Sequence, residues 1–207
     1  MRTLIKNGLV YDGSGGTPFR KDVLIKDGFI EAVTESAEAY GMEMTRAEAS
    51  GAEAAAAEVI DASGLVVTPG FIDTHRHCDI DALYNPEFGR LEMAQGLTTV
   101  IGGNCGLAPI PAPKQYRRDI YDFIEPCLGI APEEMAIERF GDYLEELGKR
   151  ELPLHVGSLL ATGTLKAAIK GYGKGPFTRQ EMDQAKAYIR EGLEAGAAGL
   201  SMGIMYQ

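Results

Sequence analysis

The sequence has no tryptophan, few cysteines and histidines, and fewer basic than acidic side chains. Its 207 residues include 20 Lys and Arg against 30 Asp and Glu, a formal net charge of -10 at pH 7. Binding to nucleic acid or to anionic membrane surfaces depends on clustered Lys and Arg, and the sequence contains no such cluster. We therefore expect neither nucleic acid nor a membrane as a partner. The 45% hydrophobic and 24% charged residues are typical of a soluble globular protein with a sizeable core.

Long apolar runs are also absent. None approaches the roughly 20 residues that span a bilayer, and the first residues lack the apolar core of a signal peptide. The three cysteines, Cys78, Cys105 and Cys127, are odd in number and far apart. This pattern favours reduced thiols over a disulfide framework and leaves thiolate ligation possible. We expect a cytoplasmic protein.

Two patterns divide the chain. Residues 1–64 contain short alternating apolar runs separated by glycine-rich turns, which predict a small antiparallel sheet. Within them, the Ala- and Glu-rich segment 36–58 has weak periodicity and is interpreted as a solvated helix or mobile insertion without chemistry. From residue 65 onward strands alternate with helices, which indicates a parallel sheet with right-handed crossovers. The expected strands are 65–74, 97–102, 154–160 and 198–202, and the expected helices are near 87–95, 114–126, 132–149 and 178–195.

The last expected helix carries signals at both of its ends. Thr178 precedes Glu181 at the spacing of a capping box, in which each residue bonds a free amide of the other. Gly196 follows the last apolar residues of the periodic pattern and suits a left-handed helix end.

Two histidines stand where the first barrel-type strand ends. His75 and His77 are spaced i, i+2, and side chains alternate along a strand, so both imidazoles leave one face with Cβ atoms roughly 6–7 Å apart. In a parallel barrel, chemistry gathers at the carboxyl ends of the strands. One cation could lie between the two rings. The alternative interpretation is a solvated strand end that binds no metal.

A cysteine follows the next strand. Cys105 lies in the turn Gly-Gly-Asn-Cys-Gly, whose glycines permit tight turning and close approach to a ligand. A thiolate there would point toward the histidines, and a His, His, Cys set is a zinc ligand set. The alternative for Cys105 is a small buried hydrophobe, and we interpret Cys78 and Cys127 in that way. His155, at the start of a strand, is interpreted as a surface or capping residue, and 171–175 as a plain loop.

Four stretches carry a family resemblance: 5–13 and 59–77 resemble the beginning of a metal-dependent amidohydrolase, and 96–106 and 199–206 resemble its D-aminoacylase (N-acyl-D-amino-acid deacylase) branch. Such enzymes combine a small β-sandwich with a TIM-like barrel. The resemblance implies an α/β fold in which residues 65–207 form the first half of a (β/α)8 barrel, preceded in 1–64 by part of the β-sandwich. The second half of the barrel has no counterpart in this sequence.

The resemblance also implies roles for individual residues. His75 and His77 would be first-strand metal ligands, Cys105 the thiolate ligand that replaces the modified lysine of other relatives, and Tyr206 a substrate contact. The implied cofactor is zinc, as one or two ions. Asp73 and Asp79 are candidates to orient the histidines through their second ring nitrogens.

The implied reaction is hydrolysis of the N-acyl amide bond of a small N-acyl amino acid. The family's later histidines and its catalytic aspartate have no counterpart here, and Thr162 stands where the branch has a histidine. We therefore expect the chain to be inactive by itself. An open half barrel exposes sheet edges and apolar surface, so we expect a homo-oligomer or pairing with a complementary fragment.

Two other functions are compatible with the sequence. The first is a non-catalytic remnant or split subunit that binds a complementary chain. The second is a cyclic amidohydrolase of the hydantoinase or dihydroorotase kind. The Cys105 turn argues against this second alternative, because those relatives place no cysteine ligand there.

Overall fold

A computed structural model describes residues 2–36 and 58–204. Tyr206 and nearly all of the Ala- and Glu-rich segment lie outside the described residues. The chain divides into two compact units, Met1–Pro69 and Gly70–Gln207. This division falls slightly later than the boundary drawn from the sequence after residue 64.

The first unit contains two small mixed sheets. The first has the order β5-β4-β1-β6 and the second the order β3-β2-β7. The predicted antiparallel pairing is confirmed for β1, β4 and β5, but β6 and β7 run parallel to β1 and β2. A parallel pair needs a long connection, and more than 50 residues separate the members of each pair. The strands are β1 (Arg2–Lys6), β2 (Leu9–Val10), β3 (Phe19–Arg20), β4 (Asp22–Lys26), β5 (Phe29–Thr34), β6 (Glu58–Asp61) and β7 (Val66–Val67).

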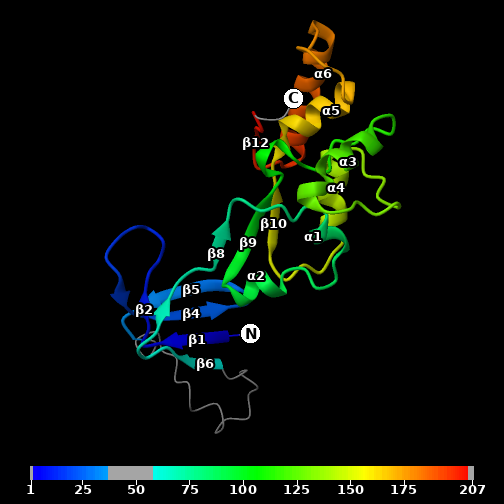
Figure 1. The fold of residues 1–207 in the computed structure, drawn as a ribbon. Coiled ribbons are helices and arrows are strands. Elements are labelled where there is room, and N and C mark those ends of the chain that lie inside the picture. Colours follow the sequence, from blue (N-terminus) through cyan, green and yellow to red (C-terminus); the bar gives the residue numbers. More distant parts are fainter. Residues whose placement is uncertain (1, 37–57, 205–207) are drawn as a thin grey trace. The chain divides into compact units, whose positions relative to one another are not determined.

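The second unit has parallel strands in chain order (Figure 1). β9 (Leu97–Gly102) lies between β8 (Phe71–Asp73) and β10 (His155–Ser158), and both neighbours are parallel to it. Directly after β10 comes β11 (Leu160–Ala161), which pairs in parallel with β12 (Leu200–Ser201). The unit is thus an α/β structure whose successive strands point the same way, so their carboxyl ends lie at one edge.

The strand expected over residues 65–74 is interrupted. Its two halves, β7 and β8, belong to different sheets. Pro69, between them, has no amide hydrogen to give to a ladder. Gly70 approaches Thr98 so closely that a Cβ would lie 2.1 Å from the threonine methyl. The apolar run in the sequence therefore covers two strands.

Six α-helices accompany the strands of the second unit within the described residues. The helix expected over 132–149 begins only at Phe140, because Met135 and Ile137 are buried in the core on non-helical backbone. The helix α5 was not expected from the sequence. The helices are α1 (Asp81–Tyr84), α2 (Arg90–Ala94), α3 (Arg117–Leu128), α4 (Phe140–Gly148), α5 (Thr162–Lys170) and α6 (Arg179–Ala195).

The capping box of α6 is confirmed. The Thr178 hydroxyl accepts a hydrogen bond from the Glu181 amide at 3.2 Å, and the Glu181 carboxylate accepts one from the Thr178 amide at 2.7 Å. Gly196 ends the helix in the left-handed region with φ 113°. Residues 171–175 form a loop, as expected.

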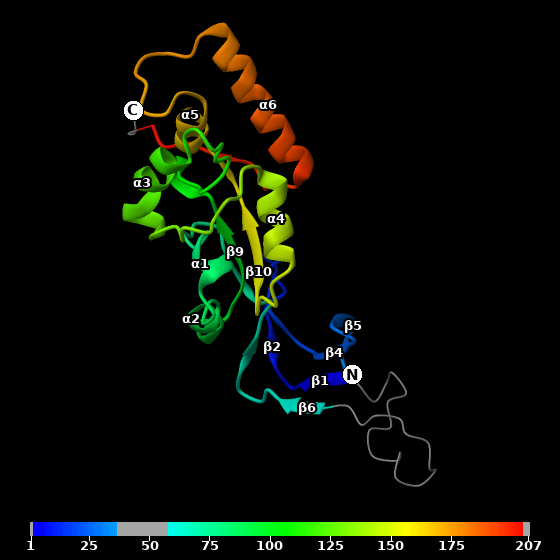
Figure 2. The ribbon, with the colours of Figure 1, turned by 90° about the vertical axis from the view of Figure 1, so that its right-hand side faces the viewer.

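The core of the second unit surrounds the middle strand. Val100 of β9 is fully buried and belongs to the same cluster as Phe140 and Tyr143 of α4. The Tyr143 hydroxyl donates to the carbonyl of Asp79 at 3.0 Å, which joins α4 to the loop after β8. Figure 2 shows α4 alongside β10, and α4 also contacts α6. Among the described helices, none is both long and apolar enough to cross a membrane.

Candidate metal centre

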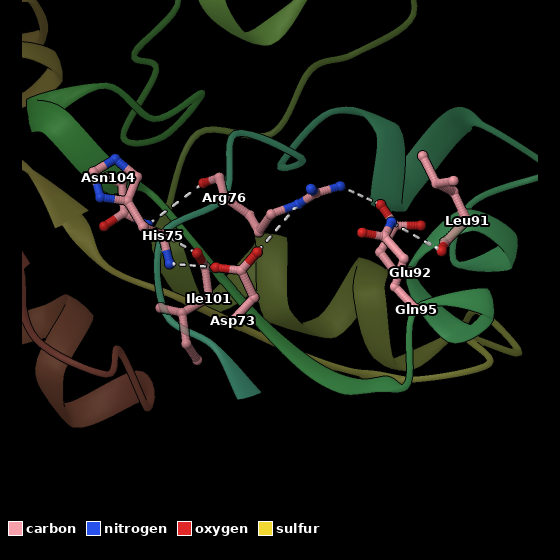
Figure 3. A network of polar contacts seen from close by, with 8 residues as sticks. All are labelled: Asp73, His75, Arg76, Leu91, Glu92, Gln95, Ile101 and Asn104. Carbon is pink, nitrogen blue, oxygen red and sulfur yellow. Dashed lines mark hydrogen bonds and ion pairs between the residues drawn. The ribbon is translucent and has the colours of Figure 1, made fainter. Parts of the chain in front are cut away.

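The two histidines lie in the loop that follows β8. Asp73, the last residue of the strand, accepts a hydrogen bond from the His75 amide at 3.0 Å (Figure 3). The Arg76 amide donates to the carbonyl of Ile101 at 3.0 Å, which extends the contact between this segment and β9. The Arg76 side chain reaches α2, where it forms an ion pair with the buried Glu92. The histidine loop is therefore held at its start by Asp73, and at Arg76 by β9 and α2.

Cys105 lies in a one-turn 3-10 helix, η3 (Asn104–Gly106), directly after β9. Gly103, Cys105 and Gly106 all have left-handed backbone, with φ of 71°, 56° and 73°. The Asn104 side chain donates to the carbonyl of Ile101 at 2.8 Å and to that of Arg76 at 3.4 Å (Figure 3). It therefore joins the cysteine turn to the histidine loop.

The structure brings His75, His77 and Cys105 together. One donor atom from each lies within 4.8 Å of the others, and His75 Nε2 is 3.2 Å from Cys105 Sγ. The two imidazole rings meet edge to face with centroids 5.6 Å apart. The Nδ1 atom of His77 is buried and has no hydrogen-bond partner among the described residues.

This donor set fits zinc. Tetrahedral zinc with bonds of about 2.0 Å to nitrogen and 2.3 Å to sulfur separates its ligand atoms by roughly 3.5 Å. Burial lowers the pKa of His77, and the nearby His75 lowers it further. A neutral imidazole is the form that binds a metal. A zinc site requires ring nitrogens that are available to the ion and a sulfur close to them. The buried His77 Nδ1 and the Cys105 Sγ meet these requirements.

The two aspartates make contacts other than the expected ones to the imidazole rings. Asp73 holds the backbone of His75. Asp79 is only 1% exposed, and its Oδ1 accepts a hydrogen bond from the Ser158 hydroxyl at 3.3 Å. Burial raises the pKa of Asp79 to about 7, although hydrogen bonds from its own amide, the Gly103 amide and Ser158 oppose the rise. Asp79 therefore links the loop after β8 to β9 and β10.

The remaining polar candidates lie elsewhere. Cys78 is buried in the core, and burial raises its pKa to about 12. Cys127 is exposed on α3, so its interpretation as a buried hydrophobe is wrong, because it lies on the solvent face of an amphipathic helix. His155 is exposed at the start of β10, the end of the strand opposite the metal donors. Thr162 is the first residue of α5.

Sequence reasoning missed Ser201. Its hydroxyl contacts the backbone on both sides of Cys105. Ser201 lies in the family motif 199–206, and this position could have indicated it. The resemblance implied a role only for Tyr206 in that motif.

Residues 58–206 match the model of the amidohydrolase family, and the chain belongs to this family. Over 98% of its length it is 32% identical to the N-acyl-D-aspartate deacylase of Alcaligenes xylosoxydans xylosoxydans, of which it covers 36%. The N-acyl-D-glutamate deacylase of Bordetella bronchiseptica, solved with zinc and a phosphonate mimic of the tetrahedral intermediate, is 27% identical with a TM-score of 0.75.

A structure of D-aminoacylase that addresses its binuclear metal center has the same identity, 27%, and the same TM-score, 0.75. In both structural comparisons the match covers 99% of this chain and 39% of the other. The chain thus spans well under half the length of the relatives it matches. The matched part of the chain includes residues of both units.

Proposed function

We propose that this chain supplies the first ligands of a zinc-dependent hydrolase that cleaves the acyl amide bond of N-acyl-D-amino acids. The observation that carries the proposal is the convergence of His75, His77 and Cys105 within 4.8 Å at the carboxyl ends of two adjacent parallel strands. The deacylase relatives support the substrate class, and the zinc in the Bordetella enzyme supports the metal. The chain order of the parallel strands also suits the first half of a barrel.

Each part of the site has a physical task in this proposal. A zinc ion, when bound, lowers the pKa of a water molecule toward about 7 and polarises an acyl carbonyl. His75 and His77 would hold the ion through ring nitrogens and Cys105 through its sulfur. Asp73 and the ion pair between Arg76 and Glu92 keep the histidine loop in place.

A proton acceptor is the part that the described residues do not provide. Amide hydrolysis needs a general base near the attacking water. The Asp79 carboxylate faces Ser158 and lies against Gly102, where a Cβ would be 2.7 Å from its Oδ1. Asp73 is bound to backbone. We propose that the base comes from outside the described residues and that this chain does not turn over substrate by itself.

Elemental analysis of the chain purified without added metal or chelator tests the metal assignment. We expect about one zinc per chain, with loss of the metal in Cys105→Ser, because the thiolate is a first ligand. Cys127→Ser is the matched control, since Cys127 is exposed and outside the donor group. Equal zinc in the parent chain and in Cys105→Ser would refute the site.

We also propose that the second unit pairs with a second copy or with a complementary fragment. In the described sheet β8 is an edge strand, and its Phe71 and Ile72 are 56% and 63% exposed. An apolar strand edge of this kind is a template for pairing. Sedimentation at micromolar concentration should show species larger than a monomer, and a monodisperse monomer would exclude self-pairing. The free cysteines suit the cytoplasm, which we propose as the location.

A further inference from the structure

The backbone at Cys105 is strained. Left-handed backbone at a residue with a side chain costs roughly 1–2 kcal/mol, and Cys105 has φ 56°. The turn is also confined: a Cβ on Gly103 would lie 2.1 Å from the carbonyl oxygen of Leu159, and one on Gly106 would lie 2.5 Å from the amide nitrogen of Gly203. The turn therefore depends on contacts with segments that are distant in the sequence.

Ser201 bridges the two sides of this turn. Its hydroxyl donates to the carbonyl oxygen of Gly103 at 2.5 Å and accepts from the amide of Gly106 at 3.0 Å. These two backbone groups flank Cys105, and the first lies 98 residues from Ser201 in the sequence. The parallel pairing of Ser201 with Ala161 places the hydroxyl at this point.

We infer that Ser201 is a positioning residue for the metal site: its hydroxyl holds the Cys105 turn closed so that the sulfur already faces His75 before a metal arrives. The inference rests on the proposed metal function. Its two hydrogen bonds go to the backbone of Gly103 and Gly106, so its effect reaches the metal through the backbone of the turn. Such outer contacts set ligand orientation, and their loss typically weakens metal binding about 10–100-fold.

Cobalt titration tests the inference, with the thiolate-to-cobalt absorption band as the readout. We expect Ser201→Ala to weaken Co²⁺ binding at least about tenfold and to alter the band, whereas Ser201→Thr, which keeps the hydroxyl, restores most of the affinity. Unchanged affinity and spectrum in Ser201→Ala would overturn the inference.

Thr164→Val is the matched control. The Thr164 hydroxyl bridges the amide and carbonyl of Ala108 at 2.9 and 2.7 Å, the same kind of bridge in the segment just beyond the turn. Its loss should lower stability but leave cobalt affinity unchanged. An equal loss of affinity in this control would show a general loss of structure and would also overturn the inference.

Hydrogen exchange of the metal-free chain separates this inference from the proposed function. Without the bridge, amides 103–107 should exchange faster in Ser201→Ala than in the parent chain or in Thr164→Val, and unchanged exchange there contradicts the role of Ser201. A parent chain that binds no cobalt would refute the proposed metal site, and the exchange result would then decide the role of Ser201 alone.

Discussion

The two strand ends that carry the donors are held in different ways. The end of β8, with His75 and His77, is held largely by nearby residues: Asp73 binds the His75 amide, and Glu92 on α2 pairs with Arg76. The end of β9, with Cys105, is enclosed by the backbone at Leu159 and Gly203 and bridged by Ser201. The histidine end is held mainly by residues near it in the sequence, with further bonds to Ile101 and Asn104, whereas the cysteine end is enclosed by segments that follow β10.

A metal site built from both strand ends depends on the contacts that hold each of them. The two histidines lie in the loop after β8, which is held through the carboxylate of Asp73 and the backbone and side chain of Arg76. The turn that carries the sulfur contacts Leu159, Ser201 and Gly203, all of which lie beyond β10 in the sequence. Perturbations at the cysteine end should therefore cost more, and should spread further, than perturbations at the histidine end.

The largest effect is expected from Gly103→Ala. A Cβ there would press on the carbonyl of Leu159, in a left-handed conformation that alanine also disfavours. We expect a loss of more than about 3 kcal/mol in the free energy of unfolding, or no folded second unit. Urea unfolding measures the loss. Gly196→Ala is the control: its backbone is also left-handed, but among the described residues a Cβ there would meet only a Leu144 methyl at 3.4 Å, so the change should cost about 1–2 kcal/mol.

The next effect concerns pH and Asp79, which joins the two ends. Its folded pKa of about 7 lies above the ordinary 3.8, so between these values the unfolded chain binds fewer protons than the folded chain. The contribution of Asp79 to stability should therefore be fully present below about pH 4 and should fall by about 2–4 kcal/mol as the pH rises to 7. Urea unfolding of the metal-free chain from pH 4 to 8 measures this slope.

Asp79→Asn should flatten that slope, because an amide does not titrate and can still accept from Ser158. An unchanged slope in Asp79→Asn would assign the pH dependence to other groups.

A smaller effect is expected at the histidine end from Glu92→Ala. Removal of the buried carboxylate leaves Arg76 without its close ion-pair partner and should cost about 1–3 kcal/mol of stability. Because the loop keeps its bonds through Asp73 and Asn104, zinc content should fall less than in Ser201→Ala. A greater loss of zinc in Glu92→Ala would reverse the comparison between the two ends. Glu87→Ala removes an exposed ion pair with Arg90 and should change stability by less than about 0.5 kcal/mol.

The smallest effect is expected from Thr178→Ala at the start of α6, away from both ends. The lost cap should cost about 1 kcal/mol in thermal or urea unfolding. Zinc content should stay at the level of the parent chain, since this helix start is encoded locally. A metal loss here would show that the site depends on the whole unit and not on the contacts around each end.

Much of the second unit could be predicted from hydrophobic periodicity and from helix-capping and turn residues. The strand β9, the capping box of α6 and the donors after the first two strands of the barrel pattern all depend on residues close together in the sequence. The break between β7 and β8 could not be predicted from the apolar run. The run continues across Pro69, but the strands before and after it belong to different sheets. The late start of α4 and the presence of α5 depend on which apolar residues are buried in the core, and tertiary packing decides this.

The sequence by itself determined the family resemblance, the paired histidines and the glycine-rich cysteine turn, because turn and strand chemistry act over a few residues. Only the tertiary structure decided that Cys105 lies 3.2 Å from His75, that Asp79 is buried against Ser158, and that Ser201 bridges the turn. Those contacts join residues up to 98 positions apart. Their geometry follows from strand pairing and packing, which no local pattern encodes.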